Sequence, residues 1–184
     1  MCITAKLHSG GRSEERVPAG LSMPIVKVVT PPPTRAADRA LERSPSRRSA
    51  LRATEQVELQ ERCPDLFLDE RDHPLTVRRL SGSKLPVSAQ CWIRGQNAGF
   101  GYWMVNHRAP YQAALVTISA DESIGASHIF ASQRNVAGDC LSAKSWAWDG
   151  KDFVPTSALT IGLCRLVTLG GPWQMPTLVT RVLK

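Results

Sequence analysis

From Cys63 to Lys184 the chain is built of short apolar runs separated by glycine, asparagine, aspartate and proline. Runs of this length with turn-forming residues between them are typical of antiparallel strands. The runs that we expect to be strands are 75–80, 85–92, 101–105, 113–118, 127–132, 145–148, 151–155 and 178–182. The sequence therefore predicts a small antiparallel β domain over residues 63–184.

The clearest strand pair surrounds the dipeptide Asp149-Gly150. An Asp-Gly dipeptide favours the positive φ values of a two-residue type I′ turn. A turn centred there places Trp148 opposite Lys151. It also places Trp146 opposite Phe153, on the same face as Trp148. We therefore expect an aromatic face that is either core or a binding surface.

The first 62 residues have a different character. Residues 1–34 contain Pro31-Pro32-Pro33, which lacks amide donors, so we expect a disordered or extended tail that contributes nothing to the core. Residues 35–62 have helical spacing that breaks at Ser44-Pro45, a suitable N-cap and first helical residue. The sequence predicts one flanking N-terminal helix over about 45–62, and thus an α+β fold that is mostly β.

Length and charge limit the classes of function. A chain of 184 residues holds one domain of ordinary size, and no apolar run approaches the roughly 20 residues of a membrane-spanning helix. The formal net charge of +7 raises nucleic acid as a partner. The densest basic stretch lacks interleaved aromatic residues, so we expect a solvated helical face. Its arginines are Arg35, Arg39, Arg43, Arg47, Arg48 and Arg52.

None of the five cysteines has the spacing of a zinc finger or ribbon. Apart from Cys2, they lie in the predicted β domain, at Cys63, Cys91, Cys140 and Cys164. The neatest pairing joins Cys63 to Cys91 and Cys140 to Cys164, and two other pairings stay open. Disulfides predict an oxidising compartment, whereas buried reduced thiols would fit a cytosolic protein.

One local constellation has the residues of a Cys/His hydrolase, namely Cys140, His128 and Asp139. Neither a nucleophile elbow nor a papain-like neighbourhood surrounds this cysteine. An acidic loop lacks the spacing of a calcium-binding loop, and we expect it to be solvated. Its residues are Asp65, Asp69, Glu70 and Asp72. With no phosphate-binding or dinucleotide motif either, we expect no catalytic residue, metal or cofactor.

Several motifs follow one another in a specific order. They are Cys91-Trp92, Asn97-Ala98, Gly101-Tyr102-Trp103, Ala131-Ser132-Gln133, Gly138-Asp139-Cys140, 145–153, Gly162-Leu163-Cys164-Arg165, Gly170-Gly171, Trp173 and 176–179. Over about residues 47–184 the chain resembles the C-terminal half of the bacterial family catalogued as domain of unknown function 1176. The resemblance implies an extracytoplasmic protein of Gram-negative bacteria. It implies no catalytic residue, because the family has no established activity.

The chain departs from that family pattern in three respects. The export signal and N-terminal half usual in the family are missing, which points to a truncated gene, a wrongly assigned start or a retained C-terminal module. Gln96 stands where we expect tyrosine. Residues 134–137 replace a longer, more basic loop, so an activity carried by that loop would be absent here.

The leading hypothesis is a non-enzymatic module of the cell envelope, periplasmic or secreted, that binds an envelope component or a protein. Aromatic and arginine side chains dominate interface energies, which selects the expected binding surface. This surface comprises Trp103, Arg134, Trp148 and Lys151. Trp92 and Trp146 are expected in the core. The alternatives are an envelope hydrolase that uses Cys140 and a basic nucleic-acid-binding protein.

Overall fold

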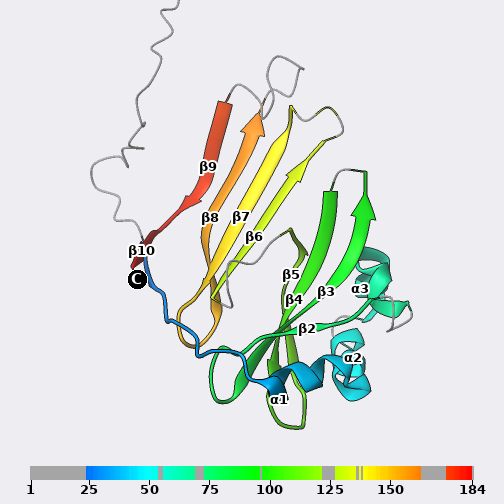
Figure 1. Ribbon diagram of the computed structural model, residues 1–184. Coiled ribbons are helices and arrows are strands. Elements are labelled where there is room, and N and C mark those ends of the chain that lie inside the picture. The colour runs from blue at the N-terminus through cyan, green and yellow to red at the C-terminus, as the bar shows by residue number, and fades with distance from the viewer. Residues whose placement is uncertain are drawn as a thin grey trace, which may run out of the picture.

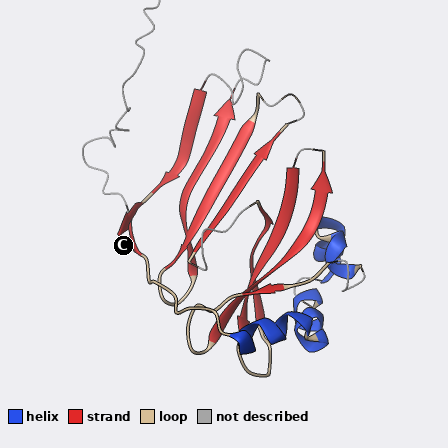
Figure 2. Ribbon diagram, viewed as in Figure 1, coloured by secondary structure: helices blue, strands red, loops and turns tan. Residues whose placement is uncertain are grey.

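Two four-stranded antiparallel sheets dominate the structure, a computed structural model in which residues 24–53, 56–68, 73–95, 97–121, 127–135, 137, 139–162 and 173–183 are described. Each sheet is a meander in chain order, β2-β3-β4-β5 and then β6-β7-β8-β9 (Figure 1). The helices precede the first sheet and lie against it (Figure 2). The predicted α+β, mostly β class is confirmed.

The strands follow the predicted runs, and each run lies in or overlaps a strand. The first sheet contains β2 (Thr76–Val77), β3 (Lys84–Arg94), β4 (Asn97–Asn106) and β5 (Ala113–Ala120). The second contains β6 (His128–Arg134), β7 (Leu141–Trp148), β8 (Phe153–Gly162) and β9 (Trp173–Val179). A short parallel pair joins β1 (Ile25–Lys27) to β10 (Arg181–Leu183).

The helical layer has several short segments in place of the single helix expected. They are α1 (Ala36–Arg39), the 3₁₀ helix η1 (Ala40–Arg43), α2 (Pro45–Arg52), α3 (Gln56–Arg62) and the 3₁₀ helix η2 (Pro64–Phe67). α2 begins at Pro45, as the sequence predicts. Leu51 from α2 and Leu59 from α3 are both buried in one core. The two helices thus contribute to the same core as separate segments.

The main core lies between the helices and the first sheet. Leu51, Leu66 and Trp103 are fully buried there. The Cys63–Cys91 disulfide is buried in the same core and ties the end of α3 to β3, which confirms the expected pairing of these two cysteines. In the chain-entropy account, a disulfide that links residues 28 positions apart stabilises a fold by roughly 3–4 kcal/mol.

The hairpin between β7 and β8 forms, but its register differs from the prediction. Trp148 pairs with Phe153, and not with Lys151. The Asp149 carboxylate accepts hydrogen bonds from two backbone amides of the turn, each at 2.8 Å. Asp149 therefore takes the first position of the turn, and Gly150, with a φ of 105°, takes the second. This moves the centre of the turn by one residue.

The N-terminal segment from residue 24 takes part in the fold. Val26 in β1 is buried, and Val29 N donates to Trp148 O at 3.0 Å. The expectation that the tail contributes nothing to the core is wrong for this part. The partner strand β10 is distant in sequence, so no local periodicity signals the pairing. Residues 1–23 lie outside the described residues, and the division at residues 34 and 62 stays a prediction.

Candidate functional site

The face of the first sheet that points away from the helices is covered at one end. There Met104 packs with Leu80 and with Trp148 of the second sheet, and Phe153 packs against this cluster. The Trp148 and Phe153 rings lie 5.7 Å apart, centroid to centroid. The β7–β8 hairpin therefore covers this end of the face and leaves the rest open.

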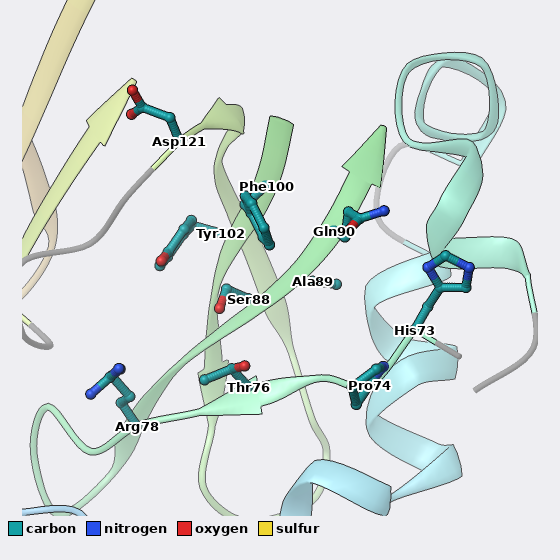
Figure 3. Close-up of a pocket in the computed structure, with 10 residues that line it drawn as sticks. All are labelled: His73, Pro74, Thr76, Arg78, Ser88, Ala89, Gln90, Phe100, Tyr102 and Asp121. Atoms are coloured by element: carbon teal, nitrogen blue, oxygen red, sulfur yellow. The ribbon is translucent and has the colours of Figure 1, made fainter. Parts of the chain in front are cut away.

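Two cross-strand rows line the open part of the face. Thr76, Ser88 and Tyr102 form one row across β2, β3 and β4. Gln90 and Phe100 pair in the neighbouring row. Above these rows lies a groove with a volume of about 410 Å³, whose lining side chains are drawn in Figure 3. Ligand sites in proteins commonly occupy about 300–1,000 Å³.

Hydrogen bonds fix the rim of the groove. Asp121 follows β5, and its carboxylate accepts a hydrogen bond from the Ser132 hydroxyl of β6. Gln90 Nε2 donates to Asp65 Oδ2 at 2.8 Å. On the side of β2, the His73 carbonyl accepts a hydrogen bond from a buried arginine of α2. The groove is thus held by contacts to both the helical layer and the second sheet.

Two adjacent arginines, Arg78 and Arg79, lie in opposite environments. Arg79 is buried and forms a two-point ion pair with Asp38, with 2.8 Å between Nε and Oδ2. Hydrogen bonding to Arg79 lowers the pKa of Asp38 from 3.8 to about 2, although burial of the carboxylate acts in the opposite direction. Arg78 is exposed, lines the groove, and its guanidinium pairs with no other described residue. Arg79 therefore secures α1 to the sheet, and Arg78 is available to a ligand.

The four residues of the expected binding surface do not form one surface. Trp103 and Trp148 are buried, so the prediction that they are surface residues is wrong. Alternation along each strand turns them inward, and Gly101 leaves the space that the Trp103 ring fills. Arg134 and Lys151 are exposed, but Arg134 lies at the end of β6 and Lys151 in the β7–β8 turn. These two positions are at opposite ends of the second sheet.

The remaining tryptophans differ in exposure. Trp92 and Trp146, both expected in the core, are half-buried, and Trp92 packs against the main core. Trp146 pairs with Pro155 across a register shift between β7 and β8. The guanidinium of Arg94 lies 5.5 Å from the centroid of the Trp92 ring. Trp173, at the start of β9, is 61% exposed.

The structure does not assemble the Cys140, His128 and Asp139 constellation. Cys140 is disulfide-bonded and provides no thiolate. His128 begins β6 and pairs with Ala147, whereas Cys140 precedes the opposite end of β7. About six residues of strand, on the order of 20 Å, separate these ends. The predicted partner Cys164 lies outside the described residues, so the Cys140–Cys164 pairing stays a prediction.

The arginines of α2 are largely structural, which corrects the expectation of a solvated face. Arg47 and Arg48 are buried, and Arg47 Nη2 donates to His107 O at 3.0 Å. Arg48 Nη1 donates to Leu66 O at 3.1 Å, and Arg52 Nη2 donates to the same carbonyl at 2.9 Å. Three cations of the basic stretch thus attach α2 to neighbouring backbone. Sequence reasoning missed this because the acceptors are carbonyls of distant residues.

Within the described ranges, no group of three or more histidine, cysteine, aspartate or glutamate residues is placed to hold a metal ion. Asp65 of the predicted acidic loop accepts a hydrogen bond from Gln90, as described above. Asp69, Glu70 and Asp72 lie outside the described residues. None of the described helices has the length and apolar character needed to cross a membrane.

A comparison with known protein families gives a match. The family model described as "Protein of unknown function (DUF1176)" matches residues 2–180. The match starts well before residue 47, where the resemblance seen in the sequence begins. No curated protein and no solved structure matches the chain.

Proposed function

The chain belongs to the DUF1176 family of proteins of unknown function, and we propose that it is a non-enzymatic, extracytoplasmic binding module of the cell envelope. The observation that carries the proposal is that Cys63, Cys91 and Cys140 are all disulfide-bonded. Disulfides form and persist in oxidising compartments such as the bacterial periplasm and the extracellular space, and they are rare in the cytosol. This chemistry supports a periplasmic or secreted location.

The fate of Cys140 supports a role other than hydrolysis. A cysteine nucleophile acts as a thiolate, and a sulfur bound in a disulfide is not a thiolate. His128, the base that the hydrolase alternative requires, lies at the far end of the β6–β7 ladder. The groove on the first sheet instead offers uncharged hydroxyls, aromatic rings and an exposed arginine, which suit binding.

The nucleic-acid alternative loses support from the same contacts that hold α2. Arg47, Arg48 and Arg52 donate to backbone carbonyls, so they cannot also pair with phosphates without leaving the fold. Binding to a nucleic acid releases counterions and therefore weakens steeply with salt. We expect no such binding of this chain to duplex DNA at low salt.

The proposal is tested by producing the chain with and without a cleavable export leader in a Gram-negative host. Unreduced, denatured protein is labelled with a maleimide, and the labelled peptides are identified. We expect Cys63, Cys91 and Cys140 to stay unlabelled in the exported protein and to react in the cytoplasmic protein. A Cys2→Ser variant is the control, because it removes a thiol outside the β domain. Full labelling of these three cysteines in the exported protein would overturn the proposal.

A further inference from the structure

Two aromatic side chains project into the groove from one strand. Phe100 and Tyr102 are two positions apart on β4, so they share a face, and both point into the groove in Figure 3. Both are half-buried, which leaves part of each ring accessible to a ligand. Accessible ring faces take up apolar C–H surfaces, and a tyrosine adds a hydroxyl at its tip.

Hydroxyl groups accompany these rings. Thr76, Ser88 and Tyr102 lie side by side on three neighbouring strands, spaced by about 4.8 Å from strand to strand. None of the three hydroxyls hydrogen-bonds to another described residue. The groove therefore presents a row of hydrogen-bonding groups next to an aromatic surface. A sugar ring has the matching chemistry, since it combines C–H faces with hydroxyl groups around its edge.

The two charged residues of the groove lie on different sides of Tyr102 in Figure 3. Arg78 pairs with none of the residues that the structure describes, and a guanidinium binds a carboxylate through two parallel hydrogen bonds. The Asp121 carboxylate, held by Ser132, is an acceptor for ligand hydroxyls. A ligand that places a carboxylate at Arg78 and hydroxyls toward Asp121 satisfies both.

From these observations we propose that the groove between β2 and β4 binds a sugar that carries a carboxylate. Tyr102 stacks on the sugar ring, the hydroxyls of Thr76 and Ser88 hydrogen-bond to its edge, and Arg78 pairs with the carboxylate. This inference rests on the proposed binding function and adds a site and a ligand class to it.

The test uses two sugars that differ in one group and a third probe that lacks the ring. Methyl glucuronide carries a carboxylate where methyl glucoside carries a hydroxymethyl group, and acetate supplies the carboxylate without the ring. Each is titrated into the oxidised full chain and followed by backbone amide NMR. We expect methyl glucuronide to bind with the largest affinity and to shift the amides of Ser88, Gln90 and Tyr102. Acetate is expected to bind much more weakly, because it has no ring to stack.

Variants separate the contributions of charge and ring. Arg78→Gln is expected to lower the affinity for methyl glucuronide about tenfold and to change that for methyl glucoside less than about twofold. Tyr102→Ala is expected to weaken both about tenfold. The matched controls are Arg108→Gln and Trp173→Ala, which remove an exposed arginine and an exposed aromatic ring outside the groove.

Three results would overturn the proposal. They are the absence of shifts at the groove with methyl glucuronide, equal affinity for glucuronide and glucoside, and unchanged binding by the folded Arg78→Gln variant. Amide mapping on the unaltered protein keeps the test valid even if Tyr102→Ala fails to fold. If the sugars do not bind but the cysteines of the exported protein are protected from labelling, the proposed envelope role stands and only the sugar site is wrong. If those cysteines react, the envelope role itself is overturned.

Discussion

The two sheets have the same number of strands and the same meander order, yet they are stabilised differently. The first sheet packs large apolar side chains against the helices, among them Trp103, Leu85 and Val105. In the second sheet several buried positions hold small or hydroxyl-bearing residues, such as Ala131, Ala147 and Ser145. The same topology can thus be stabilised by a core of large apolar side chains or by an interior that includes small and hydroxyl-bearing ones.

Hydroxyl contacts stabilise the interior of the second sheet. Ser145 Oγ lies 2.8 Å from Thr156 Oγ1 and 2.6 Å from Ser157 Oγ, joining β7 to β8. Such bonds contribute about 1 kcal/mol each, much less than the burial of a large side chain. At the edge, the residues from Trp173 to Thr177 of β9 are all exposed. The comparison predicts that mutations cost more in the first sheet than in the second.

The largest effect is expected from the core of the first sheet. Trp103→Ala removes a fully buried indole and should lower the free energy of unfolding by about 3–5 kcal/mol. The matched change Trp173→Ala, at an exposed position of the second sheet, should cost less than about 0.5 kcal/mol. Urea unfolding measures both. Similar losses in the two variants would break the comparison.

A comparable loss should follow from the ion pair that secures α1 to the first sheet. Arg79→Met leaves the buried Asp38 carboxylate without its partner, which costs about 3–5 kcal/mol. The pair also makes stability depend on pH. Because folding lowers the pKa of Asp38 from 3.8 to about 2, its contribution is complete above pH 3.8 and is lost as pH falls through 2. Acid unfolding of the Asp38→Asn variant should lack this part of the pH dependence, and an unchanged acid profile would argue against the pair.

Removal of the Cys63–Cys91 disulfide is expected to rank next. The double variant Cys63→Ala/Cys91→Ala should lose roughly 3–4 kcal/mol, because the unfolded chain regains the freedom of a 28-residue span. Thermal unfolding with and without a reductant gives the measurement. The double variant should then respond less to reductant than the parent chain. If reductant lowers the stability of the double variant as much as that of the parent chain, a disulfide other than Cys63–Cys91 is responsible for the effect.

The smallest effect should come from the hydroxyl contacts of the second sheet. Ser145→Ala removes bonds to Thr156 and Ser157 but creates almost no cavity, so a loss of about 1 kcal/mol is expected. The variant Ser142→Ala, at an exposed position of the same strand, serves as control. Hydrogen exchange of the β7 and β8 amides would localise the effect. A loss as large as that of Trp103→Ala would show that the two sheets are equally dependent on their interiors.

Local sequence patterns predict the strands and the Cys63–Cys91 pairing because alternation, turn residues and cysteine spacing are local signals. They do not predict the burial of Arg47 and Arg48, whose acceptor carbonyls come from distant loops. They also do not determine which tryptophans are buried, because a strand has two faces and only tertiary packing decides which face lies inside.

The groove was beyond sequence reasoning for a related reason. It exists because Trp148 of the second sheet covers only one end of a face of the first sheet, so that the half-buried Ser88 and Tyr102 line a groove. No motif in either strand encodes that partial cover. No sequence signal distinguishes the exposed Arg78, which lines the groove, from its neighbour Arg79, which is buried in an ion pair.

The pairing of β1 with β10 has a consequence for synthesis on the ribosome. β1 emerges before either sheet exists, and its partner β10 emerges only after both have been translated. Until then the segment from Ile25 to Lys27 lacks its parallel partner, and joining the two requires closure of a very long loop. This strand pair therefore forms late in folding. In a nascent chain stalled before β10, the unpaired β1 would be open to chaperones and proteases, whereas in the complete protein it is paired.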